Sequence, residues 1–243
     1  MTTIAQINMI KQQLRTGGVL DESVLALYEK VPRHAFVPGQ WASVAYSDLQ
    51  IPLANGERMM TPLEEGQLLQ TLALKGDETV LEIGTGSGFL TALLSQLSKK
   101  VVSVEYHATF TEEAKRKLAL QHCDNVTLIT DDGSQGWFEE APYDVIVITG
   151  ALEVIPKAFY LQLSSKGKMF AIVGKEPVMQ AKLYTRPNEQ MLQENIKSSV
   201  SQHTNAAESH LAQMRKELWE QKDVFETNLP PLIQKHFEKA FVF

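Results

Sequence analysis

The stretch Val80-Leu81-Glu82-Ile83-Gly84-Thr85-Gly86-Ser87-Gly88-Phe89 decides the fold of this chain. It begins with apolar residues typical of a buried strand and passes through three glycines at alternate positions. It then leads into Phe89-Leu90-Thr91-Ala92-Leu93-Leu94, which predicts a helix. Glycine permits a sharp backbone turn and the close approach of a ligand. Because a helix that begins at the turn directs free N–H groups and a positive dipole end toward it, the site suits an anionic or polar ligand.

A second predicted strand supports a ligand site at this turn. Val101-Val102-Ser103-Val104 ends on Glu105, and an acidic side chain about 20 residues beyond the turn can accept both hydroxyl groups of a ribose. The spacing Gly-x-Gly-x-Gly differs from the Gly-x-Gly-x-x-Gly of dinucleotide-binding folds. Residues 82–88 with Glu105 resemble the S-adenosyl-L-methionine site of class I methyltransferases. A nicotinamide site and a purely structural turn are the alternatives.

Alternating strands and helices continue on both sides of the turn. The expected strands are 79–83, 101–105, 126–130, 145–148, 169–173 and 181–185, and the expected helices are 63–74, 89–98, 109–121 and 156–163. This order predicts an α/β fold with a doubly wound, Rossmann-like sheet. The sheet is mostly parallel with an antiparallel C-terminal strand, and helices cover both faces. Because ligands of such sheets bind beyond the carboxyl ends of the strands, Gly84, Glu105, Asp132 and Thr149 are expected to converge.

The chain divides into four predicted segments. Residues 1–62 form N-terminal helices, expected at 4–16 and 24–30, and a loop-rich segment with short strands on the substrate side. Residues 63–185 form the cofactor-binding core. Residues 186–221 form a polar helical excursion, with 189–221 its most polar part, and residues 222–243 form a C-terminal strand at 224–227 and a tail that complete the core.

Composition narrows the class of protein. The chain has 243 residues, of which 44% are hydrophobic, and a net charge of -6, which argues against a nucleic-acid partner. No apolar run approaches the length of a membrane span, so no membrane association is expected. Cys123 is the only cysteine, which excludes an internal disulfide and fits a cytoplasmic location. No spacing of His, Asp and Glu predicts a metal site, and the 189–221 excursion is the candidate surface for a homo-oligomer.

Motifs outside the glycine turn resemble those of protein-L-isoaspartate O-methyltransferases. Val31-Pro32-Arg33-His34-Ala35-Phe36-Val37-Pro38 is similar to the N-terminal signature of that family. Asp131-Asp132-Gly133 with Gly136 is similar to its Gly-Asp-Gly turn, and Ala141-Pro142-Tyr143-Asp144 fits as well. The resemblance covers about residues 1–185, with a weaker echo at 224–243.

The resemblance implies S-adenosyl-L-methionine as cofactor and an isoaspartyl peptide or protein as methyl acceptor. It implies that Gly84, Gly86 and Gly88 surround the amino-acid end of the cofactor. Glu105 is expected to bind the ribose, Asp132 to accept from the adenine amino group, and Gly133 to leave room for the ring. Glu82, Thr85 and Tyr106 complete the predicted cofactor-binding set. The acceptor carboxylate is ionised at neutral pH, so the reaction needs no strong base.

Two departures from the family pattern lie on the expected acceptor side. The family has Thr-Ile-Ser before Gln-Pro or Ala-Pro, and its serine is the catalytic hydroxyl, whereas this chain reads Arg58-Met59-Met60-Thr61-Pro62. Met60 therefore replaces the serine, and Thr61 offers a neighbouring hydroxyl. These two residues are the predicted catalytic positions, although paired methionines also serve as gap-filling core residues. The family's Ala-Ala-Pro after the fourth strand is replaced by Thr149-Gly150-Ala151-Leu152.

The departures keep alternative functions open. The leading hypothesis is an S-adenosyl-L-methionine-dependent O-methyltransferase of the isoaspartyl-repair type. The first alternative is a methyltransferase of the same fold that acts on a small molecule or on another protein group. The second is a non-catalytic relative that retains the fold and binds the cofactor, and a nicotinamide-linked dehydrogenase is more distant still.

Overall fold

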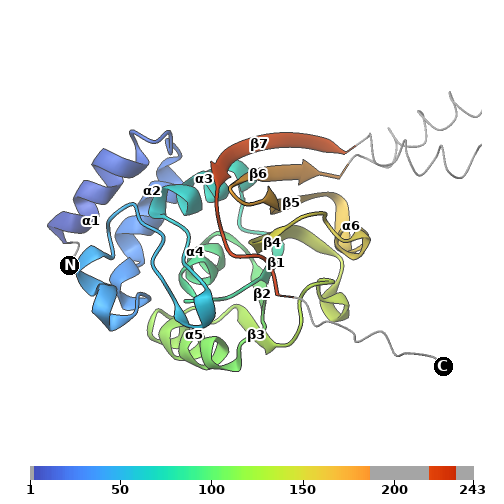
Figure 1. Ribbon diagram of the computed structural model, residues 1–243, viewed down its shortest axis with the longest axis horizontal. Coiled ribbons are helices and arrows are strands. Elements are labelled where there is room, and N and C mark those ends of the chain that lie inside the picture. The colour runs from blue at the N-terminus through green and yellow to red at the C-terminus, as the bar shows by residue number, and fades with distance from the viewer. Residues whose placement is uncertain (1–2, 187–218, 234–243) are drawn as a thin grey trace, which may run out of the picture.

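A computed structural model of the chain describes residues 3–186 and 219–233, and its centre is a seven-stranded sheet (Figure 1). The strand order is β3-β2-β1-β4-β5-β6-β7. The strands are β1 Thr79–Ile83, β2 Lys100–Glu105, β3 Val126–Thr130, β4 Tyr143–Leu152, β5 Leu163–Lys175, β6 Val178–Thr185 and β7 Glu220–Thr227. Strands β1 to β5 pair in parallel, while β6 is antiparallel to both β5 and β7. The predicted doubly wound sheet is therefore confirmed, with its topological switch between β1 and β4.

The helices match the sequence periodicity closely in the core and less well near the N-terminus. The α-helices are α1 Ile4–Asn8, α2 Glu22–Lys30, α3 Pro62–Leu72, α4 Phe89–Leu97, α5 Ala108–Leu120 and α6 Lys157–Gln162. The helix expected at 4–16 begins as α1 and continues as the π-helix η1 Met9–Leu14.

The loop-rich segment 34–62 was expected to contain short strands, and that prediction is wrong. Short 3₁₀ helices of one or two turns occupy much of it instead. These turns are η2 Arg33–Ala35, η3 Gly39–Val44 and η4 Ala54–Gly56; a further one, η5 Phe138–Glu140, precedes β4. Within residues 34–62, which are all described, a single isolated β-bridge pairs Pro52 with Arg58. The frequent Pro and Gly residues explain the difference, because they interrupt the backbone ladder that a strand requires.

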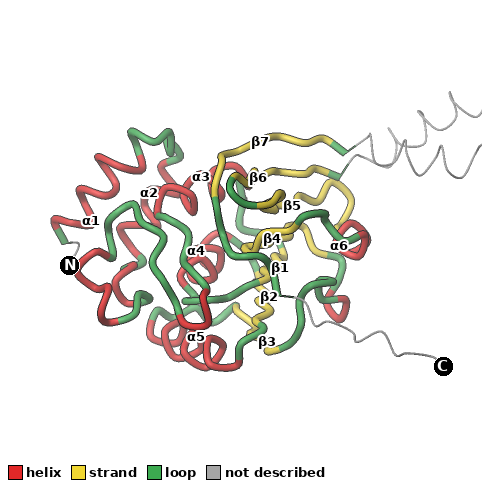
Figure 2. Tube along the Cα trace, viewed as in Figure 1, coloured by secondary structure: helices red, strands yellow, loops and turns green. Residues whose placement is uncertain are grey.

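Helices and loops cover both faces of the sheet (Figure 2). Alternate residues of a strand face opposite layers. Val80 belongs to the larger core cluster, which also contains buried residues of the N-terminal helices and of α3, α4 and α5. Leu81 and Ile83 belong to the second cluster, which contains Phe159 of α6. The N-terminal segment thus shares one continuous core with the sheet.

Five strands extend beyond their predicted limits: β2 by one residue, and β4, β5, β6 and β7 by more. The structure begins β7 at Glu220, although only 224–227 was expected, because polar residues such as Lys222 and Asp223 pair with β6 despite their exposure. Apolar runs reveal the buried part of a strand and miss such polar, paired ends. The register places Thr185 opposite Glu220. Most of the predicted polar excursion, residues 187–218, lies outside the described residues.

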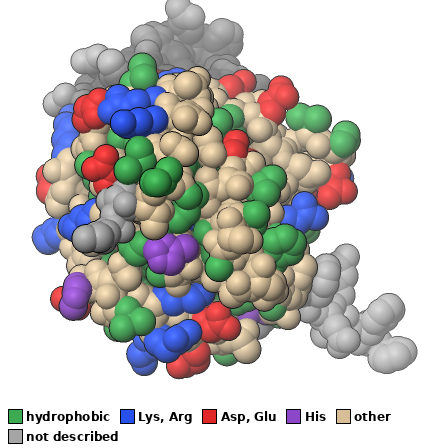
Figure 3. Space-filling model, turned by 90° about the vertical axis from the view of Figure 1, so that its left-hand side faces the viewer, with side chains coloured by type: hydrophobic (Ala, Val, Ile, Leu, Met, Phe, Trp, Pro, Cys, Tyr) green, Lys and Arg blue, Asp and Glu red, His purple; other side chains and the backbone are tan. Residues whose placement is uncertain are grey.

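Two further features of the described residues concern membrane-spanning helices and metal-ligand clusters. No helix in the described part is long and apolar enough to cross a membrane. Within residues 3–186 and 219–233, no group of three or more His, Cys, Asp and Glu side chains could hold a metal ion. On the face shown in Figure 3, Lys and Arg side chains lie interspersed with Asp and Glu.

Candidate functional site

A pocket opens at the carboxyl ends of β1, β2 and β4, where the sequence predicted convergence. Seven of the predicted site residues line it: Met60, Gly84, Thr85, Gly86, Glu105, Tyr106 and Gly133. Four do not line it: Thr61, Glu82, Gly88 and Asp132. The remaining walls come from residues 53–59 and 230–233 and from side chains next to the predicted motifs.

The glycine turn is held against the end of β4. Gly84 has a φ of +96°, which favours glycine, and its N–H donates to the Val104 carbonyl at 2.8 Å. The Thr149 hydroxyl donates to the carbonyls of Ile83 and Gly84 at 2.9 and 3.0 Å. A Cβ on residue 84 would collide with that hydroxyl oxygen. Thr149 therefore tethers the end of β4 to the turn.

Glu105 lies at the end of β2 and is 5% exposed. One carboxylate oxygen accepts the Gly86 N–H and the other accepts the His107 N–H, both at 2.8 Å. An ionised carboxylate offers about four lone-pair positions, so about two remain for a ligand. The side chain is thus fixed by the turn and still able to accept two hydroxyl groups.

Glu82 acts from beneath the turn rather than from the pocket wall. It is fully buried, and one oxygen accepts the hydroxyls of Thr91 and Ser103, each at 2.6 Å. Ser103 in turn shares a hydrogen bond of 2.6 Å with the Thr85 hydroxyl. The second oxygen has no hydrogen-bond partner among the described residues, and burial raises the pKa of Glu82 to about 7. This network connects β1, β2 and α4 below the glycines.

Gly88 is also outside the pocket wall. It precedes α4 with a φ of +83°, and a Cβ there would lie 3.0 Å from the Ala114 Cβ. Its role in the structure is to let α4 begin close against α5.

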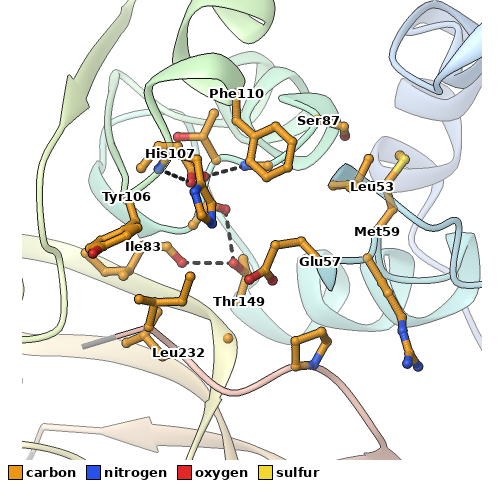
Figure 4. A pocket seen from close by; sticks show the side chains of 18 of the residues that line it. Leu53, Glu57, Met59, Ile83, Ser87, Tyr106, His107, Phe110, Thr149 and Leu232 are labelled. Carbon is orange, nitrogen blue, oxygen red and sulfur yellow. Dashed lines mark hydrogen bonds between the residues drawn. The ribbon is translucent and has the colours of Figure 1, made fainter. Parts of the chain in front are cut away.

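An aromatic wall stands beside Glu105, and only Tyr106 of its members was predicted. The His107 ring lies 5.3 Å from the Tyr106 ring and 5.4 Å from the Phe110 ring, measured between centroids. His107 Nε2 is buried without a hydrogen-bond partner in the described part of the chain. In Figure 4 the His107 ring points into the pocket. This wall and the bare backbone of Gly133 suit a flat ring, and the aromatic residues that follow Glu105 were the signal for it.

Asp132 is turned toward its own loop. Its Oδ1 accepts the Ser134 N–H at 2.9 Å, and Asp131 Oδ1 accepts the Asp132 N–H at 2.7 Å. Gly133, by contrast, lines the pocket, and a Cβ there would lie 3.0 Å from Ile83 Cγ2. The predicted contact of Asp132 with an adenine amino group therefore stays a prediction.

The opposite wall comes from the segment before α3. Met59 and Met60 line the pocket and are buried, and Glu57 points from this segment toward the His107 side (Figure 4). Burial raises the pKa of Glu57. Thr61 instead begins α3 as its N-cap: its hydroxyl accepts the Glu64 N–H at 3.2 Å, and Glu64 accepts the Thr61 N–H at 2.7 Å. The structure thus brings Met60, and not the Thr61 hydroxyl, to the pocket.

A short segment after β7 closes one side, and the sequence did not reveal it. The Ala151 N–H donates to the Pro230 carbonyl at 2.9 Å, and the Leu232 N–H donates to the Ala151 carbonyl at 2.8 Å. A Cβ on Gly150 would lie 2.9 Å from the Leu232 Cα. The segment 230–233 therefore crosses the end of β4 at close range, and Leu232 reaches the pocket in Figure 4.

A family model and two known relatives of this chain carry the same family description. The family model described as protein-L-isoaspartate(D-aspartate) O-methyltransferase matches residues 5–205. A protein-L-isoaspartate O-methyltransferase of Methanoculleus marisnigri is 40% identical over 166 residues, which cover 68% of this chain and 76% of the relative. One of Dictyoglomus turgidum is 37% identical over 183 residues, with 75% and 83% covered.

A solved structure extends the likeness in fold. It is a Plasmodium falciparum protein described as a beta-aspartate methyltransferase in complex with S-adenosyl-L-homocysteine. It superposes with a TM-score of 0.70, covers 93% of this chain and 97% of its own, and is 16% identical. At this identity the likeness concerns the fold alone.

Proposed function

The chain belongs to the protein-L-isoaspartate(D-aspartate) O-methyltransferase family, and we propose that its pocket brings the isoaspartyl carboxylate of a peptide or protein to the cofactor between residues 57–60 and the glycine turn. The protein is an S-adenosyl-L-methionine-dependent methyltransferase. The observation that supports this arrangement is a single continuous pocket. Its wall includes both the cofactor motifs and the Met59–Met60 side.

The residues present fit this cofactor. The free acceptor positions of Glu105 suit the ribose hydroxyls, and the aromatic wall with Gly133 suits the adenine ring. Gly84, Thr85 and Gly86 present backbone to the remaining, amino-acid part. Bound there, S-adenosyl-L-methionine supplies an electrophilic methyl group on a sulfonium. A cytoplasmic location, the absence of nucleic-acid and membrane partners, and self-association through 189–221 stay predictions.

This chain's own contribution to the reaction is orientation. The acceptor carboxylate is already ionised at neutral pH, so no residue has to remove a proton from it. The apolar Met59 and Met60 side chains exclude water from this end of the pocket, and the segment 230–233 covers another side. Alignment of two reactants in an enclosed site supplies a large share of catalysis in such transfers.

The acceptor is tested by methyl transfer to matched peptides. Initial rates with a labelled methyl donor are compared for an isoaspartyl peptide and the same peptide with ordinary aspartate. We expect transfer to the isoaspartyl peptide alone. Transfer to neither peptide, by protein that binds S-adenosyl-L-methionine in calorimetry, would contradict the proposed acceptor and favour a different substrate.

Two variants test the acceptor wall. Met60→Ser adds a hydroxyl to the wall, and a positioned hydrogen bond is worth on the order of 10²-fold in rate, so we expect faster transfer. Thr61→Val removes only a helix cap in the structure, so we expect it to cost about 1 kcal/mol of stability and to leave the KM for the peptide unchanged. A parent rate abolished by Thr61→Val in folded protein would place the hydroxyl of Thr61 in the reaction after all.

A further inference from the structure

The acceptor side of the pocket contains a carboxyl group that the function described above leaves unused. Glu65 stands in the first turn of α3 and lines the pocket next to Met60. Its side chain is 4% exposed. A carboxyl group so deeply buried is costly unless it is paired, and one placed at a substrate pocket requires an explanation beyond packing.

Arg33 fixes one side of this carboxyl group. The fully buried guanidinium donates Nη1 to Glu65 Oε2 and Nη2 to the Met60 carbonyl at 2.6 Å. Its central carbon lies 4.9 Å from the centroid of the Phe89 ring. Arg33 thereby ties Glu65 directly to residue 60, the position of the family's serine. Glu65 Oε1 makes no hydrogen bond with any described residue, and Glu65 is part of the pocket wall, so Oε1 is the oxygen that remains able to bond a ligand.

The protonation of Glu65 follows from its neighbours. Burial raises the pKa of Glu65 to about 8, against the lowering effect of Arg33 on η2. Glu64 on α3 and Glu82 on β1 add like charge that raises it further. Tyr28 on α2 is the other titratable group beside it, and its hydroxyl donates to the Pro62 carbonyl at 3.0 Å. An incoming acceptor carboxylate is a further like charge, so it favours the protonated form more strongly.

We propose that Glu65 binds the acceptor carboxylate by donating the hydrogen of its own carboxyl group, in place of the hydroxyl that the family has at residue 60. The inference rests on the proposed function. Oε2 stays with Arg33, and the proton stays on Oε1, so no bond is broken at Glu65. The hydrogen bond orients the acceptor carboxylate, and the proton between the two carboxyl groups removes their mutual repulsion.

The test is the pH dependence of peptide binding. Titration calorimetry measures the affinity of the isoaspartyl peptide for the protein saturated with S-adenosyl-L-homocysteine, between about pH 6 and 10. The proton is present below about pH 8 and lost above it, so affinity should be level at low pH. Above that value it should fall by about tenfold per pH unit, which is the slope for a single linked proton. An analogue in which the acceptor carboxylate is a carboxamide carries no like charge and should bind without this decline.

Glu65→Gln keeps an acceptor for Arg33 and an N–H donor for the pocket, and it does not titrate. We expect it to bind the peptide within about threefold of the parent at neutral pH and to lose the decline above about pH 8. Glu64→Gln is the matched control, because Glu64 is the adjacent carboxylate and does not line the pocket, so it should keep the decline.

The outcomes separate this inference from the proposed function. A level profile in the parent, a decline that persists in Glu65→Gln, or an equal decline for the carboxamide analogue would overturn the role of Glu65 while peptide methylation stands. If the parent neither binds nor methylates the isoaspartyl peptide at any pH, the proposed function fails, and the inference fails with it. The parent profile and the analogue need no variant, so they decide the question even if Glu65→Gln does not fold.

Discussion

At the scale of single residues, Glu105 is the side chain on which the proposed cofactor site depends most directly. It is buried, held by two backbone N–H groups and still able to accept further hydrogen bonds. Glu105→Ala should weaken S-adenosyl-L-methionine binding by about 1–3 kcal/mol, the usual scale for losing charge-assisted hydrogen bonds. Calorimetry measures the change, with Glu105→Gln as a matched control of nearly the same shape. Unchanged affinity in a folded alanine variant would remove Glu105 from the site.

Glu82 leads to a prediction about stability. Its pKa in the folded protein, about 7, lies above the ordinary value of 4.5. The stabilising contribution of its proton is therefore fully present below about pH 4.5 and is lost as the pH rises to about 7. In the parent, this titration should lower the free energy of unfolding by as much as ~1.4 kcal/mol per pH unit. The Glu82→Gln variant has no ionisable group at this position, so its free energy of unfolding should change less with pH.

Chemical denaturation across that pH range tests the Glu82 prediction. Glu112→Gln, on the exposed face of α5, serves as the control and should keep the slope of the parent. Glu65 also titrates, so the loss of unfolding free energy continues toward pH 8 in the parent and in every variant that keeps Glu65. An equal slope for the parent and Glu82→Gln between pH 5 and 7 would contradict the assignment.

Residues differ in how far sequence alone could place them. Gly84 and Glu105 were predicted correctly to line one pocket because the turn and the strand end are local features with a fixed spacing. Met60 and Thr61 are adjacent in sequence, and only the start of α3 decides that Met60 faces the pocket while the Thr61 hydroxyl caps the helix. Glu65 escaped prediction because its proposed role depends on Arg33, which lies 32 residues earlier in the chain.

At the scale of elements, the contact between the end of β4 and the segment 230–233 is tight enough to test. Gly150→Ala places a Cβ 2.9 Å from the Leu232 Cα, a backbone atom that cannot rotate away. We expect the segment to shift and cofactor affinity to fall by about tenfold, since overpacking of this kind costs about 1–3 kcal/mol. Gly39→Ala, which enters open space, is the control. Equal affinities for the two variants would show that the segment does not shape the site.

Elements were predicted well where apolar residues form a clear run or period and poorly where they do not. The apolar cores of β1 and β2 alternate with helices in a pattern that leaves little choice of fold. The polar half of β7 and the 3₁₀ turns of residues 33–56 carry no such pattern, because their geometry is set by pairing and by Pro and Gly residues. The segment 230–233 joins the pocket through contacts with residues far away in the sequence, such as Ala151. A local pattern of apolar residues cannot predict contacts of this kind.

At the scale of the whole molecule, the sheet register predicts that residues 187–218 can be removed. Thr185 and Glu220 are directly paired, so Arg186 and Trp219 can be joined by a two-residue Asn-Gly turn of the kind that connects antiparallel strands. We expect the shortened protein to melt cooperatively and to bind S-adenosyl-L-methionine with the affinity of the parent. Scanning calorimetry and light scattering measure folding and self-association. Loss of cooperative melting would show that the removed residues carry part of the fold or hold an oligomer together.

The span of the pocket wall along the chain has a consequence for biosynthesis. Its lining begins at Leu53 and ends at Ile233, so a nascent polypeptide that has left the ribosome only as far as β5 already contains the glycine turn and Glu105 but lacks the last wall. Domains form as their chain emerges, and long-range contacts form last. We therefore expect ligand capture to wait for the final strands, because a prematurely terminated product lacks the wall that residues 230–233 supply.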